Sequence, residues 1–167
     1  ACNKKLDGDD RDKGGPDRNR GNHPKTPETE TVIDGFQRTL HELLVMPEAG
    51  LAYVPIYGDG IHGRNPNPGH VLHVFDLNKR KLADTIDLSP YVAPHTLRLA
   101  ADGLIYITCE NSAMVAVIDP KTNKMIDAIE SGSTNGRRLT ITNDGQRLYT
   151  DNEEDATVSV IDVPNRK

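Results

Sequence analysis

The sequence lacks the features that mark several functional classes. No apolar run among its 167 residues approaches the length that a membrane-spanning helix needs. Its net charge of −5, without clusters of basic residues, argues against nucleic acid as a partner. It contains no Gly-x-Ser-x-Gly elbow, no phosphate-binding glycine loop and no haem-attaching Cys-x-x-Cys-His. Neither catalysis nor a particular cofactor is therefore indicated by a motif.

Apolar residues are almost missing from the first thirty positions. Residues 1–30 hold three apolar side chains, four glycines, three prolines and seven residues of each charge sign. Such a segment cannot bury enough apolar surface to offset the conformational entropy lost on folding. We predict a disordered hydrophilic arm over residues 1–30 and a folded domain over residues 31–167.

Cysteine occurs only at positions 2 and 109, in two different settings. Cys109 ends a strand-like apolar run, which predicts a small buried hydrophobe. Cys2 follows Ala1 and precedes a charged tether, the arrangement found at the acylated cysteine of bacterial lipoproteins, but no apolar signal segment precedes it. Two interpretations stay open: lipidation of an exported protein at Cys2, or an incidental thiol.

What the sequence does contain is an internal repeat. Segments 73–79, 116–122 and 159–165 share an aspartate after two apolar residues, and the aspartates are 43 residues apart both times. Tyrosine-containing segments at 51–54, 104–107 and 147–150 are spaced by 53 and 43 residues, as are the Ile-acidic segments ending at 34, 87 and 130. The first repeat is therefore ten residues longer than the second. The inserted residues fall within 57–70, where glycine and proline predict a loop.

Each repeat predicts four short antiparallel strands. In the second repeat these are residues 95–99, 104–109, 114–119 and 124–129, joined by turn sequences such as Asp-Gly. Four strands in a period of about 40–45 residues are typical of β-propeller blades. We predict about three blades, the third without its outer strand, and expect the chain to be the front part of a longer protein.

Apolar residues also recur in the first strand of each repeat, and we expect them to pack between neighbouring blades. These residues are Leu43 and Val45, Leu97 and Leu99, and Leu139 and Ile141.

The repeat resembles the YVTN repeat of bacterial surface-layer and periplasmic propellers. The shared pattern is a turn, Tyr-Val/Ile, Val-Ile-Asp, Lys and Ile, with a histidine near the start of strand one, and it covers about residues 31–167. The chain departs from the consensus after Tyr53, Tyr106 and Tyr149, where Val-Pro-Ile, Ile-Thr-Cys and Thr-Asp-Asn follow. The resemblance implies an all-β propeller, usually of seven blades, in the periplasm or at the cell surface.

Three residues with donor side chains share one repeat position. His41, His95 and Arg137 each stand two residues before the first apolar residue of strand one, the strand that lines a propeller channel. They should converge at the top of the channel and suit a carboxylate, a phosphate or an acidic cofactor edge. The simpler interpretation is that histidine there is an ordinary repeat residue bonded to a neighbouring turn.

The inserted loop is expected at the same end, where His62, Arg64 and His70 would form a rim. The spacing of His70 and His73 matches no compact metal motif, so we predict no metal site.

The sequence thus predicts an exported, non-catalytic scaffold that binds an unidentified small anionic ligand or a protein. It predicts no nucleic-acid partner, and membrane contact only through a lipid at Cys2. The alternative, implied by similar propellers, is an enzyme or cofactor carrier of the lactonase, quinoprotein dehydrogenase or haem d1 kind.

Overall fold

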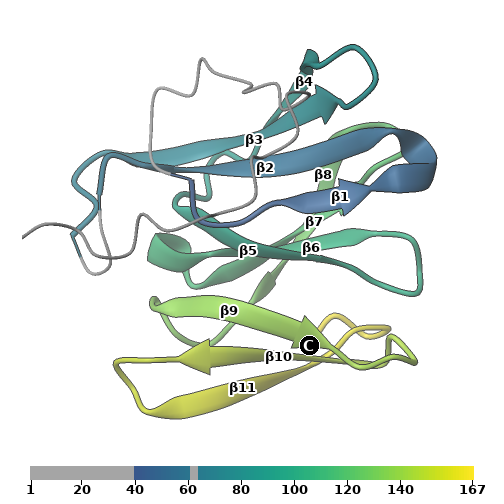
Figure 1. The fold of residues 1–167 in the computed structure, drawn as a ribbon. Coiled ribbons are helices and arrows are strands. Elements are labelled where there is room, and N and C mark those ends of the chain that lie inside the picture. The colour runs from purple at the N-terminus through teal and green to yellow at the C-terminus, as the bar shows by residue number, and fades with distance from the viewer. Residues whose placement is uncertain (1–39, 61–63) are drawn as a thin grey trace, which may run out of the picture. The chain divides into compact units, whose positions relative to one another are not determined.

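A computed structural model describes residues 40–60 and 64–167 of the chain. The predictions for the arm, for Cys2 and for His62 lie outside these residues. Within them, eleven strands pair in antiparallel fashion in three separate sheets, which we call blades 1, 2 and 3 (Figure 1). No helix in the described part of the chain is long and apolar enough to cross a membrane.

The blades follow one another along the chain. Blade 1 consists of β1 (Leu44–Met46), β2 (Leu51–Gly58), β3 (Pro68–Asp76) and β4 (Lys81–Asp87). Blade 2 consists of β5 (Pro94–Leu99), β6 (Ile105–Cys109), β7 (Met114–Asp119) and β8 (Lys124–Glu130). Blade 3 consists of β9 (Gly136–Ile141), β10 (Arg147–Asn152) and β11 (Thr157–Asp162). Short 3₁₀ helices η1 (Pro47–Ala49) and η2 (Glu110–Ser112) connect strands in blades 1 and 2.

The observed sheets confirm the predicted blade architecture. Each complete blade is a four-stranded antiparallel meander, and the bounds of the four strands of blade 2 lie within one residue of the prediction. Blade 3 has three strands among the described residues, and β11 pairs there only with β10.

The prediction of a loop over 57–70 was wrong at both ends of that segment. β2 continues to Gly58 and β3 begins at Pro68, so the connection covers residues 59–67. The ladder shifts register beside Gly58, whose φ of +131° favours glycine. Gly69 is needed because a Cβ there would collide with the Ile56 carbonyl. Glycine and proline therefore mark an irregular hairpin end here as well as a loop.

The core lies between the blades and consists of two main apolar clusters. The first joins blades 1 and 2, with Tyr53, Leu72 and Val74 packed against residues such as Leu97 and Ile107. The second cluster joins blades 2 and 3. Its buried side chains include Tyr106, Val115, Val117 and Ile129 of blade 2 and Leu139, Leu148 and Ile161 of blade 3.

The expected packing of the first-strand apolar pairs holds for Leu97 and Leu139, which are buried, and fails in blade 1. Leu43 and Val45 are 57% and 44% exposed, whereas their neighbours Leu44 and Met46 pack on the first cluster. Side chains alternate along a strand, and Leu43 and Val45 lie on the face away from blade 2, where the described residues provide no further blade. Leu99, at the end of β5, is also exposed.

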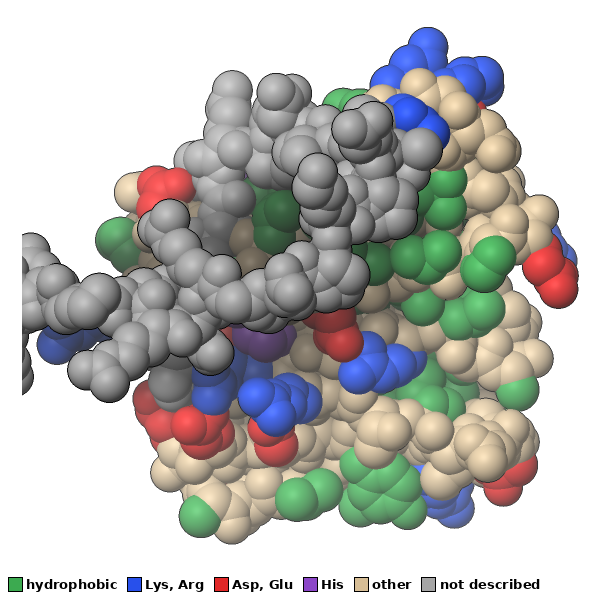
Figure 2. Space-filling view, viewed as in Figure 1, with side chains coloured by type: hydrophobic (Ala, Val, Ile, Leu, Met, Phe, Trp, Pro, Cys, Tyr) green, Lys and Arg blue, Asp and Glu red, His purple; other side chains and the backbone are tan. Residues whose placement is uncertain are grey.

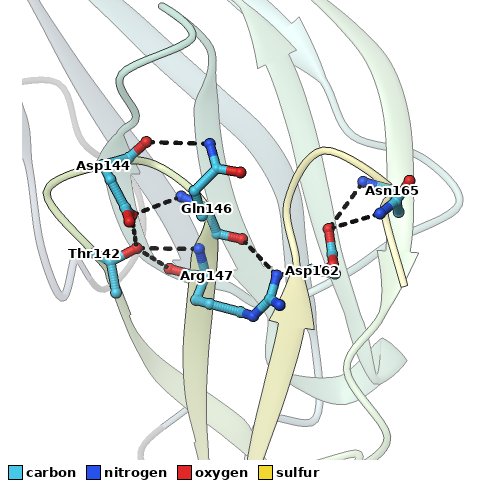
Figure 3. A network of polar contacts seen from close by, with 6 residues as sticks. All are labelled: Thr142, Asp144, Gln146, Arg147, Asp162 and Asn165. Carbon is cyan, nitrogen blue, oxygen red and sulfur yellow. Dashed lines mark hydrogen bonds and ion pairs between the residues drawn. The ribbon is translucent and has the colours of Figure 1, made fainter.

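The aspartates that mark the repeat stabilise turns. The Asp76 Oδ1 accepts the backbone N–H of Asn78 at 3.0 Å, and Asp119 does the same for Lys121 at 2.9 Å. Asp162 accepts from the Asn165 N–H at 3.1 Å and pairs with Arg147 at 2.8 Å, as Figure 3 shows. The Asn165 hydrogen bonds and the nearby Arg147 charge lower the pKa of Asp162. The aspartates therefore recur every 43 residues because each blade contains a turn that an aspartate at this position stabilises.

Cys109 is buried in the first cluster, as predicted, and burial raises the pKa of its thiol to about 12. We expect Cys109 in a Cys2→Ser chain to resist a maleimide at pH 7.5 until denaturant is added, because the thiolate is the reactive form. Mass spectrometry of the adduct measures this. Labelling in native buffer at the rate of an unfolded chain would contradict the burial.

Candidate functional site

His41, His95 and Arg137 converge at the ends of the three first strands. His41 lies three residues before β1, while His95 and Arg137 are the second residues of β5 and β9. The imidazole rings of His41 and His95 stack, with centroids 4.6 Å apart and an interplanar angle of 26°. All three side chains line one cavity of about 420 Å³, together with Glu42, Thr96, Arg98 and Arg138. In Figure 2, basic and acidic side chains gather around a histidine on this side of the molecule.

Side chains from the second strands hold the starts of β5 and β9 in place. The Thr108 hydroxyl accepts the Thr96 N–H at 3.1 Å and donates to the Arg137 carbonyl at 2.6 Å, which ties blade 2 to blade 3. The Asp151 carboxylate accepts the N–H groups of Arg137 and Arg138 at 3.1 and 2.7 Å. The backbone beside the cavity is thus fixed by groups on β6 and β10.

A second row of residues, which the sequence analysis missed, lies at the ends of the second strands. Tyr57, Glu110 and Glu153 each stand four residues after the repeat tyrosine and are spaced by 53 and 43 residues. The Tyr57 ring packs edge-on against His41 and His95, with centroids 4.4 and 5.6 Å apart. Tyr57 and Glu110 are both 1% exposed. The repeat spacing could have revealed this row.

The two histidines are neutral at physiological pH. Burial, followed by the nearby His41 and Arg137, lowers the pKa of His95 to about 4. Burial and the Arg137 charge also lower the pKa of His41. Burial and the Glu110 carboxyl raise the pKa of Tyr57 to about 12. A neutral imidazole offers one N–H donor and one acceptor nitrogen, so the rings can still bind a polar ligand.

The permanent cations of the cavity differ in their partners. Arg137 forms an ion pair with Glu153, so the charge of this predicted donor is already neutralised within blade 3. Arg98 pairs with Glu42 at 2.6 Å. Arg138 is exposed, and its guanidinium has no ion-pair partner among the residues that the structure describes.

The predicted rim residues lie near the same end, because β2 runs from the η1 turn back toward His41. Arg64 is exposed in the 59–67 connection, and His70 is exposed on β3 rather than in a loop. Neither lines the cavity described above. Within residues 40–60 and 64–167, no three His, Cys, Asp or Glu side chains are grouped as metal ligands.

Comparison with known proteins supports the architecture. The chain is similar to a solved structure of hydrazine synthase from Kuenenia stuttgartiensis, with a TM-score of 0.59 and 19% sequence identity. The fold is a β-propeller. The similarity covers 88% of this chain and 36% of that protein, so the chain spans about a third of its length. No protein-family model and no curated protein matches the chain.

Proposed function

We propose that the chain is part of an exported, non-catalytic β-propeller that binds a small anionic ligand in the cavity between His41, His95 and Arg137. The export component is supported by Ala1-Cys2 ahead of a charged tether. The resemblance to YVTN-type propellers supports a periplasmic or cell-surface location.

The observation that carries the ligand-binding proposal is the donor set of the cavity. Three arginines and two neutral imidazoles face a space of about 420 Å³ that two glutamates only partly neutralise. Arg138 offers an exposed guanidinium, whose planar fork suits a carboxylate or a phosphate. The neutral histidines can add hydrogen bonds without repelling the arginines.

The pKa values of His95 and of the neighbouring Tyr57 favour a role for these two residues in binding over one in proton transfer. An efficient general base or acid has a pKa near the working pH. His95, with a pKa of about 4, and Tyr57, with a pKa of about 12, both lie far from neutrality. These two side chains are suited to orienting a ligand, and this is why we rank the enzyme alternative second.

Calorimetric titration with inorganic phosphate and with succinate at pH 7 tests the proposal. We expect Arg138→Gln to weaken binding of the better of these anions by at least about tenfold, because a charge-assisted hydrogen bond contributes about 1.5–3 kcal/mol and about 1.4 kcal/mol corresponds to a factor of ten. His95→Gln should also weaken it, whereas Lys121→Gln, in an exposed turn at the far end of β7, is the charge-matched control. The proposal fails if neither anion binds, or if the control weakens binding as much as Arg138→Gln.

A further inference from the structure

The side chains that line the cavity between His41, His95 and Arg137 are all polar. Among the described residues, this space of about 420 Å³ is bounded by imidazole, guanidinium, carboxylate and hydroxyl groups, and none of the lining side chains is a hydrocarbon. Small-molecule pockets are usually lined mainly by apolar side chains, with a few polar groups between them. The lining therefore suits a ligand that forms hydrogen bonds along most of its length, and it stabilises an alkyl chain poorly.

The ion pairs of the cavity leave a single net positive charge for a ligand. Glu42 neutralises Arg98 at 2.6 Å, and Glu153 neutralises Arg137. Arg138 has no ion-pair partner within the described part of the chain. The two neutral histidines add no charge. A ligand with one negative charge therefore matches the cavity better than a dianion or a neutral zwitterion does.

Two buried atoms of the lining find no hydrogen-bond partner in the part of the chain that the structure describes. Glu42 uses Oε1 for the ion pair with Arg98, while its Oε2 accepts no hydrogen bond. Arg137 uses Nη2 for the ion pair with Glu153, while its Nε–H donates to no acceptor. Buried polar atoms are nearly always paired, so these two indicate a partner that enters the cavity. That partner must offer a donor to Glu42 and an acceptor to Arg137.

A hydroxyl group is the donor that fits Glu42 best. An ammonium group would bring a second positive charge beside the Arg98 guanidinium, which already donates to the other oxygen of the same carboxylate. Like charges at this distance repel each other, whereas a hydroxyl donates without adding charge. The stacked neutral imidazoles can pair with further hydroxyl groups, because a neutral imidazole both donates and accepts.

We propose that the ligand of the cavity is a polyhydroxylated monocarboxylate of the sugar-acid class. Its carboxylate is bound by the Arg138 guanidinium, one hydroxyl group donates to Glu42 Oε2, and another ligand oxygen accepts from the Arg137 Nε–H. The assignment rests on the proposed function, because it specifies the anion that binds in the same cavity. Glu42 is the residue that selects for the hydroxyl groups.

Calorimetric titration of the 167-residue chain with gluconate and with hexanoate at pH 7 tests this selectivity. Both are monocarboxylates with the same number of carbon atoms, and only gluconate carries hydroxyl groups. We expect gluconate to bind at least about tenfold more tightly, as expected for one hydrogen bond to a charged group. This comparison on the wild-type chain needs no variant.

Glu42→Gln separates hydroxyl selectivity from anion binding. The variant leaves Arg98 without its carboxylate, so hexanoate should bind more tightly than it binds to the wild type. The preference for gluconate should fall severalfold, because an amide oxygen is a weaker acceptor than a carboxylate. Glu48→Gln, at an exposed position of η1 at the other end of blade 1, is the charge-matched control and should keep the wild-type preference.

Three results would overturn the sugar-acid assignment and leave anion binding in place. They are equal affinities for gluconate and hexanoate, a Glu42→Gln chain that keeps the wild-type preference, and a chain that binds phosphate or succinate but neither gluconate nor hexanoate. If none of these four anions binds, the proposed function fails together with the assignment.

Discussion

Replacing Leu97 by alanine should lower the free energy of unfolding by about 2–5 kcal/mol. Leu97 is fully buried in the cluster between blades 1 and 2, and its strand, β5, also carries His95. Alanine there removes the packing of three side-chain carbons and leaves a cavity at the contact between two blades. Urea unfolding followed by circular dichroism measures the loss.

The matched control is Ile126→Ala, because Ile126 on β8 is 50% exposed. We expect this substitution to change the unfolding free energy by no more than about 0.5 kcal/mol. Similar losses for Leu97→Ala and Ile126→Ala would show that the contact between blades 1 and 2 contributes little to stability.

Acidification should destabilise the chain through His95. Its pKa is about 4 in the folded chain and near 6.5 when unfolded, so between these values the unfolded state binds more protons. The stability contributed by neutral His95 is therefore complete above about pH 6.5 and is lost as the pH falls toward 4. We expect a loss of about 2 kcal/mol, since one pKa unit corresponds to about 1.4 kcal/mol and solvent reaches part of the ring.

Unfolding measured at pH 7, 5.5 and 4 in wild type and His95→Gln isolates this contribution, because the carboxylates titrate in both chains. The variant should lose less stability than the wild type over this range. His70→Gln, at an exposed position of β3, should follow the wild type. An identical pH dependence in His95→Gln and wild type would mean that His95 is protonated equally well in the folded and unfolded chains.

Much of the fold could be predicted from the sequence because the repeat markers have local physical causes. Asp76, Asp119 and Asp162 close turns with their own backbone neighbours, so their spacing reports the blade period directly. The exposure of Leu43 and Val45 could not be predicted in the same way. It depends on whether another blade lies against that face, which is a tertiary property absent from a single repeat.

The first row of the candidate site was predicted from the sequence, and the second was missed although its spacing follows the repeat. His41, His95 and Arg137 were found because they precede the apolar residues of strand one. Tyr57 lies in a segment whose glycine and proline content indicated a loop, and Glu110 follows a strand, where a carboxylate is usually a solvated turn residue. The ion pair that occupies Arg137 depends on side-chain geometry that spacing does not specify.

The row of residues that lines the cavity and the row that lies beside it give the site a modular chemistry. Each blade contributes one residue from each row: His41 with Tyr57 from blade 1, His95 with Glu110 from blade 2, and the Arg137–Glu153 ion pair from blade 3. The two main apolar clusters that hold the blades together contain none of these six residues. The polarity and charge of the pocket can therefore diverge one blade at a time, so related propellers could acquire different ligands while keeping the same packed framework.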